Sequence, residues 1–438
     1  MLISPPEKKA PFYINRDFGL FWVGQAISII GDWLFDTTLV LWIANKIAFK
    51  QDWASVAVAG VYVATAIPAL LVGPLAGVFV DRWPKRPVLL WMDALRALLV
   101  LLLIVASGLV PFLPVPVSTG SQLASIYGVV LLASVCSQFF APAKLTLIGD
   151  LVSKEDRPRA SSFLQGNLYL AVVLGPLLAP ILFFGVGVTW ALLAEALSYM
   201  ASFATIFALK LTRFEDEEAP AGNKARFWTE FFEGLRFFAK NQVLRVVLIS
   251  TVLATVGTGV GNALLFFFAT VNLGAPPELF SILQTGLGIG LLVGVVLAPR
   301  YIRWLGNARA FWSGMLGIGV TSVIFAQLTN FPAAVAVFFL TGVVNALPNV
   351  ASGPLVINST PRELLGRVSA VFNPLTTLSA LAASALGGYL YGTVLHDFHF
   401  SLLGFTFGPL DTIFTFVGLM LVAAGVYAWW GLRDARDV

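Results

Sequence analysis

The sequence predicts an all-α membrane protein with twelve transmembrane helices, and three observations support this fold class. First, 58% of the 438 residues are hydrophobic and only 11% are charged, whereas a soluble domain carries about 25% charged residues. Second, twelve apolar runs approach the roughly 20 residues that cross a bilayer as a helix. Third, all of the 27 Lys and Arg residues except Lys46 and Lys50 fall on one side of the membrane when those runs are threaded through it.

The twelve apolar runs are distributed along nearly the whole chain. Several contain or adjoin Gly and Pro, which membrane helices tolerate. The predicted spans lie near residues 18–43, 54–80, 88–108, 122–148, 160–184, 188–210, 244–272, 279–302, 309–329, 332–357, 367–394 and 411–432.

The distribution of Lys and Arg predicts the orientation of the spans. Cytoplasmic segments of membrane proteins are enriched in these residues, so both termini are expected in the cytoplasm and the chain in the cytoplasmic (inner) cell membrane, as a multi-pass protein. Arg96 and Lys144 fall inside spans but near their cytoplasmic ends. We expect these two long side chains to extend toward the membrane surface.

Several classes of function are disfavoured. The single cysteine, Cys136, allows no intrachain disulfide and no cysteine-based metal site. His396 and His399 form a His-x-x-His pair in an outer loop, but no nearby Cys or Glu completes a metal site. The chain has no phosphate-binding G-x-x-x-x-G-K-[ST], no G-x-S-x-G and no cleavable signal. We expect no cofactor, no nucleic-acid partner and no enzymatic activity.

The longest polar stretch divides the chain into residues 1–210, a linker at 211–243, and residues 244–438. Aromatic residues of the linker share one side of a helical wheel, which predicts an amphipathic helix on the cytoplasmic membrane surface; a solvated linker is the alternative. The two flanking halves carry matching features at nearly the same spacing, namely Pro142 and Arg159 in the first and Pro348 and Arg367 in the second. We therefore expect two six-helix repeats.

A short basic connector between the second and third spans is the most distinctive motif. Pro84 and Pro87 prevent one helix from running through it, and a glycine, an acid and bases are spaced as G-x-x-x-D-R-x-x-[KR]-R. The residues that form this pattern are Gly77, Asp81, Arg82, Lys85 and Arg86. The pattern resembles the signature loop of the major facilitator superfamily, which lies between the second and third helices of its members.

The resemblance implies a major facilitator fold and a role for the loop. In that family the Asp, here Asp81, lies at the N-terminal end of the eleventh helix, where the helix dipole favours an anion. The bases bind an acid near the cytoplasmic end of the fourth helix, for which Asp150 is the nearest candidate. Such contacts latch the halves in an outward-facing state. Gly77 is expected to allow close approach of a neighbouring helix, and Pro84, in place of a family Gly, alters the turn.

Further stretches are similar to the twelve-helix drug:proton antiporter branch, which includes macrolide and siderophore exporters and lysophospholipid flippases. They are 27–32 in the first span, 139–143 with 150–152 around the end of the fourth, and Gly175-Pro176 in the fifth, which resembles the core of the antiporter motif. Ala179 and Pro180 replace the final glycines of that motif.

Polar residues follow one face of the first span. Gln25, Ser28, Asp32 and Asp36 recur at steps of three, four and four, so they form one stripe on a helix. Asp32 lies 14 residues beyond Phe18, or about 21 Å along the helix, near mid-membrane. A carboxyl group in hydrocarbon is costly unless it is protonated, paired or wetted. We interpret Asp32, assisted by Asp36, as the proton-coupling site; the alternative is a hydrogen bond that only fixes helix packing.

Glu195 in the sixth span is a third candidate for proton coupling. It is expected to pair with the outer part of the first span near Asp36 and share a proton with it, or else to be a partly wetted acid near the outer interface. Amides elsewhere either line the cavity or bridge helices, which is their commoner use. These amide residues are Gln138, Asn262, Gln284, Asn345 and Asn349.

The sequence thus predicts a monomeric secondary transporter that exports a hydrophobic or amphipathic small molecule by alternating access, driven by protons. A lipid flippase of the same fold would move lysophospholipid even after the proton gradient is collapsed. A non-transporting sensor or scaffold would keep its phenotype in Asp32→Asn and Asp81→Asn variants.

Overall fold

The computed structural model describes residues 14–433 except 111–116, 154, 211–235, 237–239, 362–363, 396–397, 399 and 403–404. The predicted linker helix lies almost wholly outside the described residues, as do His396 and His399. The backbone of Asp81 is described, but its side chain is not.

The first half of the chain folds into six transmembrane helices, one of them interrupted. The interruption lies at Val72, two residues before Pro74, whose ring nitrogen cannot donate a helical hydrogen bond. The elements are α1 (Arg16–Trp42) continued by the π-helical η1 (Ile43–Ile47), α2 (Ala54–Leu71), α3 (Gly73–Arg82), α4 (Lys85–Ala106), α5 (Thr119–Leu151), α6 (Arg157–Gly185) and α7 (Val188–Phe207).

The second half repeats this plan and adds a short hairpin before its last helix. Its elements are α9 (Gln242–Phe267) with the π-helical η3 (Phe268–Asn272), the 3₁₀ turn η4 (Pro277–Leu279), α10 (Phe280–Leu305), α11 (Asn307–Ala326), α12 (Phe331–Asn358), α13 (Leu365–Tyr389) with the π-helical η6 (Leu390–Val394), the antiparallel strands β1 (Phe400–Leu402) and β2 (Phe405–Phe407), and α14 (Pro409–Leu432).

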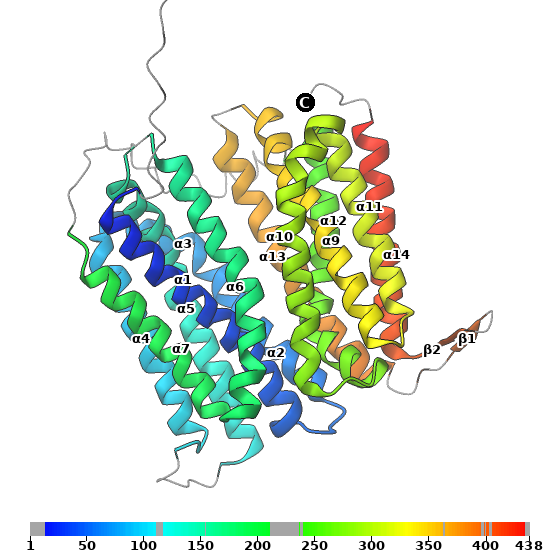
Figure 1. Ribbon diagram of the computed structural model, residues 1–438, viewed down its shortest axis with the longest axis horizontal. Coiled ribbons are helices and arrows are strands. Elements are labelled where there is room, and N and C mark those ends of the chain that lie inside the picture. The colour runs from blue at the N-terminus through cyan, green and yellow to red at the C-terminus, as the bar shows by residue number, and fades with distance from the viewer. Residues whose placement is uncertain are drawn as a thin grey trace, which may run out of the picture.

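The predicted all-helical membrane fold is confirmed. Eleven helices among the described residues are long and apolar enough to cross a bilayer. The twelfth, α13, has 25 residues but is interspersed with Ser, Thr and Asn. Helix α1 begins and helix α14 ends at the same end of the bundle (Figure 1), which we call the terminal end; the other is the opposite end.

Equivalent asparagines cap the first helix of each half. Asn15 accepts from the Phe18 amide at 2.7 Å and donates to the Leu151 carbonyl at the end of α5. In the second half, Asn241 accepts from the Leu244 amide at 3.1 Å and donates to the carbonyl of residue 359 at the end of α12. Each cap satisfies an otherwise unpaired amide and ties the first helix of its half to the fourth. The match agrees with the expected repeat.

Glycines allow helices within each half to touch backbone to backbone. A Cβ added to Gly175 of α6 would lie 2.4 Å from Cβ of Trp33 and 2.9 Å from N of Leu34, both on α1. One added to Gly319 of α11 would lie 2.4 Å from a backbone nitrogen of α14. Such small-residue contacts replace the hydrophobic driving force that is weak between helices in lipid.

The two halves meet through α2 against α13 and through α6 against α10. Near the opposite end, the Ser55 hydroxyl of α2 donates to the Gly388 carbonyl of α13 at 2.9 Å. On the second seam, a Cβ added to Gly288 would lie 3.0 Å from a methyl group of Val173. Toward the terminal end the two groups of helices diverge (Figure 1).

Gly77 and Pro84 of the basic connector differ from the expectations for a tightly packed glycine and an altered turn. A Cβ added to Gly77 meets no atom within 4 Å, so the predicted close approach at Gly77 is wrong for this conformation, in which the halves diverge at that end. Pro84 takes an ordinary φ of −64° as the residue that precedes α4. The turn therefore needs no left-handed residue at this position, and proline fits it.

Candidate functional site

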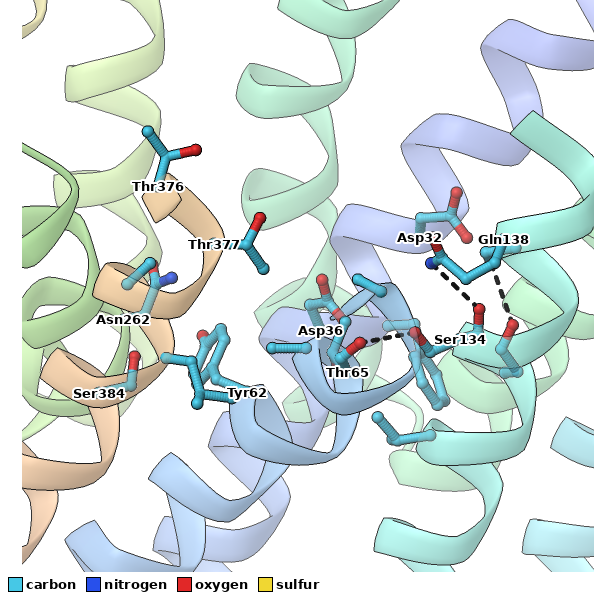
Figure 2. A pocket seen from close by; sticks show the side chains of 18 of the residues that line it. Asp32, Asp36, Tyr62, Thr65, Ser134, Gln138, Asn262, Thr376, Thr377 and Ser384 are labelled. Atoms are coloured by element: carbon cyan, nitrogen blue, oxygen red, sulfur yellow. Dashed lines mark hydrogen bonds between the residues drawn. The ribbon is translucent and has the colours of Figure 1, made fainter. Parts of the chain in front are cut away.

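A cavity of about 550 Å³ lies between the two halves. It is walled by α1, α2, α5 and Tyr199 of α7 on one side and by α9 and α13 on the other. Figure 2 shows the acids and an amide of the first half facing Asn262 and the hydroxyls of the second. Its polar lining residues are Asp32, Asp36, Tyr62, Thr65, Ser134, Ser137, Gln138, Tyr199, Thr255, Asn262, Thr376, Thr377 and Ser384.

The charge of the cavity wall is one-sided. Asp32 and Asp36 are the carboxyl groups among the described lining residues, and that lining includes no Lys, Arg or His. The second half contributes neutral hydroxyl and amide groups to the described wall. A concave site with acids and no neighbouring base on its wall raises the local concentration of cations, protons included.

Asp32 is held by a hydrogen bond and opens toward the cavity. The Tyr199 hydroxyl of α7 donates to its Oδ1 at 2.7 Å. Asp32 is half-buried, whereas Asp36, one turn farther along α1, is exposed to the cavity. The close packing of Gly175 of α6 on Trp33 fixes the α1 backbone next to Asp32, with Pro176 buried behind it. The antiporter-like pair therefore supports the acid without lining the cavity.

Glu195 lies behind the cavity wall and is fully buried. A Cβ added to Gly31 would lie 2.3 Å from its Oε2, and the Ser198 hydroxyl donates to the same oxygen at 3.0 Å. Glu195 interacts electrostatically with Asp32, so its neighbour on α1 is Asp32 and not Asp36 as expected from the sequence.

The polar stripe of α1 divides between two environments. Toward the terminal end, Gln25 is 1% exposed and its Nε2 donates to Oγ of Ser202 on α7 at 3.0 Å. Ser28 is also buried. Gln25 thus joins α1 to α7 within the first half, and of the stripe Asp32 and Asp36 are the residues in the described cavity lining.

The amide candidates divide in the same way. Gln138 and Asn262 line the cavity from opposite halves. Gln284 of α10 accepts from the Thr37 hydroxyl of α1 at 3.4 Å, so it bridges the halves. On α12, Asn349 donates to Asn345 at 2.7 Å, and neither residue is part of the described cavity lining; the two amides pair along their own helix.

A buried ion pair, which the sequence interpretation missed, lies beside this site. Arg96 and Asp93 of α4 are 4% and 0% exposed and form a salt bridge. The guanidinium carbon of Arg96 lies 4.3 Å from the ring centroid of Tyr199 and 4.4 Å from that of Phe140. The expectation that Arg96 extends to the membrane surface is wrong, because a partner one turn away and two aromatic faces hold it inside the bundle. The Asp-x-x-Arg spacing was the available signal.

The basic connector makes contacts within its own half. Arg86 donates to the carbonyl of Ile206 at 3.2 Å and to that of Phe207, at the end of α7. Lys85 donates to the carbonyls of Val80 and of residue 83. Arg82 is exposed, and Asp150 is half-buried in the last turn of α5. The latch assigned to Asp81, Arg82, Lys85, Arg86 and Asp150 therefore stays a prediction.

Among the residues that the structure describes, no group of three or more His, Cys, Asp or Glu side chains is arranged to hold a metal ion.

Comparison with known sequences identifies relatives over most of the chain. The family profile described as Major Facilitator Superfamily matches residues 21–384. The uncharacterized MFS-type transporter YfiS of Bacillus subtilis is 24% identical over 381 residues, or 84% of each chain. The lysophospholipid transporter LplT of Yersinia pestis is 27% identical over 339 residues, or 75% of each chain.

Solved structures share the fold at low sequence identity. A bacterial homologue of the iron transporter ferroportin in an inward-facing state superposes with a TM-score of 0.68 at 16% identity, covering 97% of this chain and 99% of that one. The nucleoside transporter NupG gives a TM-score of 0.65 at 13% identity, covering 96% of this chain and all of that one.

Proposed function

Since the chain belongs to the major facilitator superfamily and is a membrane transporter, not an enzyme, we propose that it is a proton-coupled exporter of a hydrophobic or amphipathic small molecule. The observation that carries this proposal is the pair of carboxyl groups, Asp32 and Asp36, on an otherwise uncharged wall of the cavity between the halves. An ionisable side chain within a membrane span is costly and most often belongs to a functional site.

Asp32 is the coupling residue in this proposal. It reaches the cavity on one side and the Tyr199 hydroxyl on the other, so it can exchange a proton with water in the cavity while remaining oriented. Protonated Asp32 is neutral and releases a cationic or dipolar substrate, whereas ionised Asp32 attracts it. This competition links the movement of substrate to the movement of protons in opposite directions.

Rocking of the halves would carry the cavity from one side of the membrane to the other. The Ser55–Gly388 contact joins the halves near the opposite end, and they diverge toward the terminal end (Figure 1). With both termini placed in the cytoplasm by the positive-inside rule, this conformation is inward-facing, and the latch around Asp81 would engage in the outward-facing state. We place the protein in the cytoplasmic membrane as a monomer.

Lysophospholipid transport is the second candidate, because LplT of Yersinia pestis is among the relatives of this chain. A lysophospholipid has a phosphate group, for which the described cavity lining offers no Lys, Arg or His. The cavity wall therefore favours a neutral or cationic amphipath over a lipid headgroup. A sensor that kept the fold without transport would retain its phenotype in Asp32→Asn.

The proposal is tested by accumulation of ethidium and a panel of neutral hydrophobic dyes in exporter-deficient cells, with and without an uncoupler. Wild type is expected to lower accumulation of at least one dye only while the proton gradient is present, and Asp32→Asn is expected to abolish this effect. Glu278→Gln, which changes an exposed carboxyl group outside the cavity, is the control and should behave as wild type.

Three results would contradict proton-coupled export. If the wild type lowers the accumulation of no dye, the proposal of drug export is wrong. If Asp32→Asn still shows normal export that the uncoupler abolishes, the coupling role of Asp32 is wrong. Movement of a fluorescent lysophosphatidylethanolamine that persists with the uncoupler would establish the second candidate instead.

A further inference from the structure

A cation is stacked on the aromatic ring that holds the coupling carboxyl group. Arg96 lies on the face of Tyr199, 4.3 Å from the ring centroid, and the hydroxyl of the same ring donates to Asp32 at 2.7 Å. The three side chains come from α4, α7 and α1, and Arg96 does not line the described cavity. A cation over an aromatic face is attracted to the ring electrons, so Arg96 restrains the ring that presents its hydroxyl to Asp32.

The ion pair with Asp93 explains how an arginine stays at this position. An unpaired guanidinium inside the bundle would be costly, and Asp93, one turn earlier on α4, neutralises it. Ser202 of α7 lies beside Asp93 and accepts from Gln25 of α1. The buried part of the α1 stripe therefore belongs to the same network that holds Arg96.

Charged and titratable groups of the first half lie near Asp32 on α1, α2, α4, α5 and α7, among them Tyr62 of α2, which lines the same cavity. Asp36 shares α1, Glu195 lies on α7, the Asp93–Arg96 pair lies on α4, and Lys144 of α5 acts on it from farther away. From α6, the close neighbour is Gly175. Arg96 stands out because it reaches Asp32 through a side chain that contacts both residues.

We propose that Arg96 is a positioning residue for the cavity carboxyl: stacked on Tyr199 and anchored by Asp93, it orients the Tyr199 hydroxyl onto Asp32 and thereby holds the carboxyl group in the orientation from which it exchanges its proton with the cavity. Loss of either the stacked cation or the Tyr199 hydroxyl frees the Asp32 carboxyl group from this orientation. This inference rests on the proposed coupling role of Asp32.

The test uses the conformation of the protein as its readout, so no substrate is needed. Ser55 is 1% exposed, covered by α13 where the halves meet, and a cysteine there reacts with a maleimide only when the opposite end opens. Ser55→Cys is made in a Cys136→Ala background, and its labelling rate in membranes is measured from pH 5 to 9. Val186→Cys, at a position 58% exposed beyond α6, corrects for the pH dependence of the reagent.

Labelling in the reference protein is expected to follow a curve with one midpoint, and Asp32→Asn to flatten it. Arg96→Gln and Tyr199→Phe should each move the midpoint away from the reference value. Arg96→Lys keeps the positive charge, so its midpoint should return most of the way to the reference value. A purely structural role would lower protein yield without moving the midpoint.

The outcomes separate the two proposals. A pH-independent reference curve, or an unchanged curve in Asp32→Asn, overturns the coupling role of Asp32. If the Asp32→Asn curve is flat but Arg96→Gln and Tyr199→Phe keep the reference midpoint, only the positioning role of Arg96 is overturned. If Arg96→Gln fails to fold because Asp93 is left unpaired, the double variant Asp93→Asn with Arg96→Gln, which leaves neither charge unpaired, decides.

Discussion

Gly388→Ala is expected to prevent the two halves from closing at the opposite end. A Cβ added to Gly388 of α13 would lie 2.8 Å from Cβ of Ala59 and 2.8 Å from the carbonyl oxygen of Ser55, both on α2. Unstrained contacts lie near 3.5–4.0 Å, and one contact is with backbone, which cannot rotate away. Overpacking of this kind costs about 1–3 kcal/mol.

The strain in Gly388→Ala falls on the contact between the halves, so it can be relieved by opening and not by unfolding. A penalty of about 1–3 kcal/mol on the closed form shifts the equilibrium between closed and open forms by about 5- to 150-fold. Gly387→Ala is the matched control, because a Cβ there meets atoms of α9, in its own half, at ordinary distances of 3.5 to 3.7 Å.

The assay measures the distance between spin labels at the opposite end by pulsed electron paramagnetic resonance. Labels at Val186→Cys and Val394→Cys, 58% and 57% exposed on different halves, are introduced in the Cys136→Ala background. Gly388→Ala should enrich the longer distance, and Gly387→Ala should match the parent. An unchanged distance distribution in Gly388→Ala would refute the assignment of this contact as the closed gate.

Two further predictions concern stability. Arg86→Gln should lower the free energy of unfolding by about 1.5–3 kcal/mol, because a charged donor to the Ile206 carbonyl is lost. Arg82 is exposed, so Arg82→Gln should change the free energy of unfolding little. Equal thermal melts of the two variants in detergent would contradict the prediction. Gly319→Ala should lower the free energy of unfolding by about 1–3 kcal/mol, because its Cβ clashes with the backbone of α14. Gly166→Ala, with no atom within 4 Å of the added Cβ, is the control in the same melts. Equal melting of Gly319→Ala and Gly166→Ala would count against the close packing at Gly319.

The transmembrane helices could be predicted from the sequence because each apolar run is a local property. The polar stripe of α1 was also visible, since residues at helical spacing share a face. The division of this stripe between packing and cavity could not be predicted. Gln25 contacts Ser202 and Asp32 contacts Tyr199, and the residues near α1 in the chain do not indicate which part of the stripe faces a neighbouring helix and which part faces the cavity. Such pairing depends on how helices distant in the sequence are arranged.

Arg96 shows the same limit from the other direction. Its distance from the end of the span suggested a side chain that reaches the membrane surface, and that interpretation considered only the helix on which it lies. The salt bridge to Asp93 was within reach of sequence reasoning, because the two residues are three positions apart on one helix. The aromatic faces of Phe140 and Tyr199 were not, because they come from α5 and α7.

The one-sided charge of the cavity wall implies a division of labour between the halves. The carboxyl groups and the network that supports them belong to the first half, while α9 and α13 add neutral hydroxyl and amide groups to the described wall. We therefore expect substitutions on α9 and α13 to change which compounds are accepted without altering the proposed proton-coupling groups. A chimera that joins the first half of this chain to the second half of a relative is expected to keep the proposed coupling groups and exchange the selectivity.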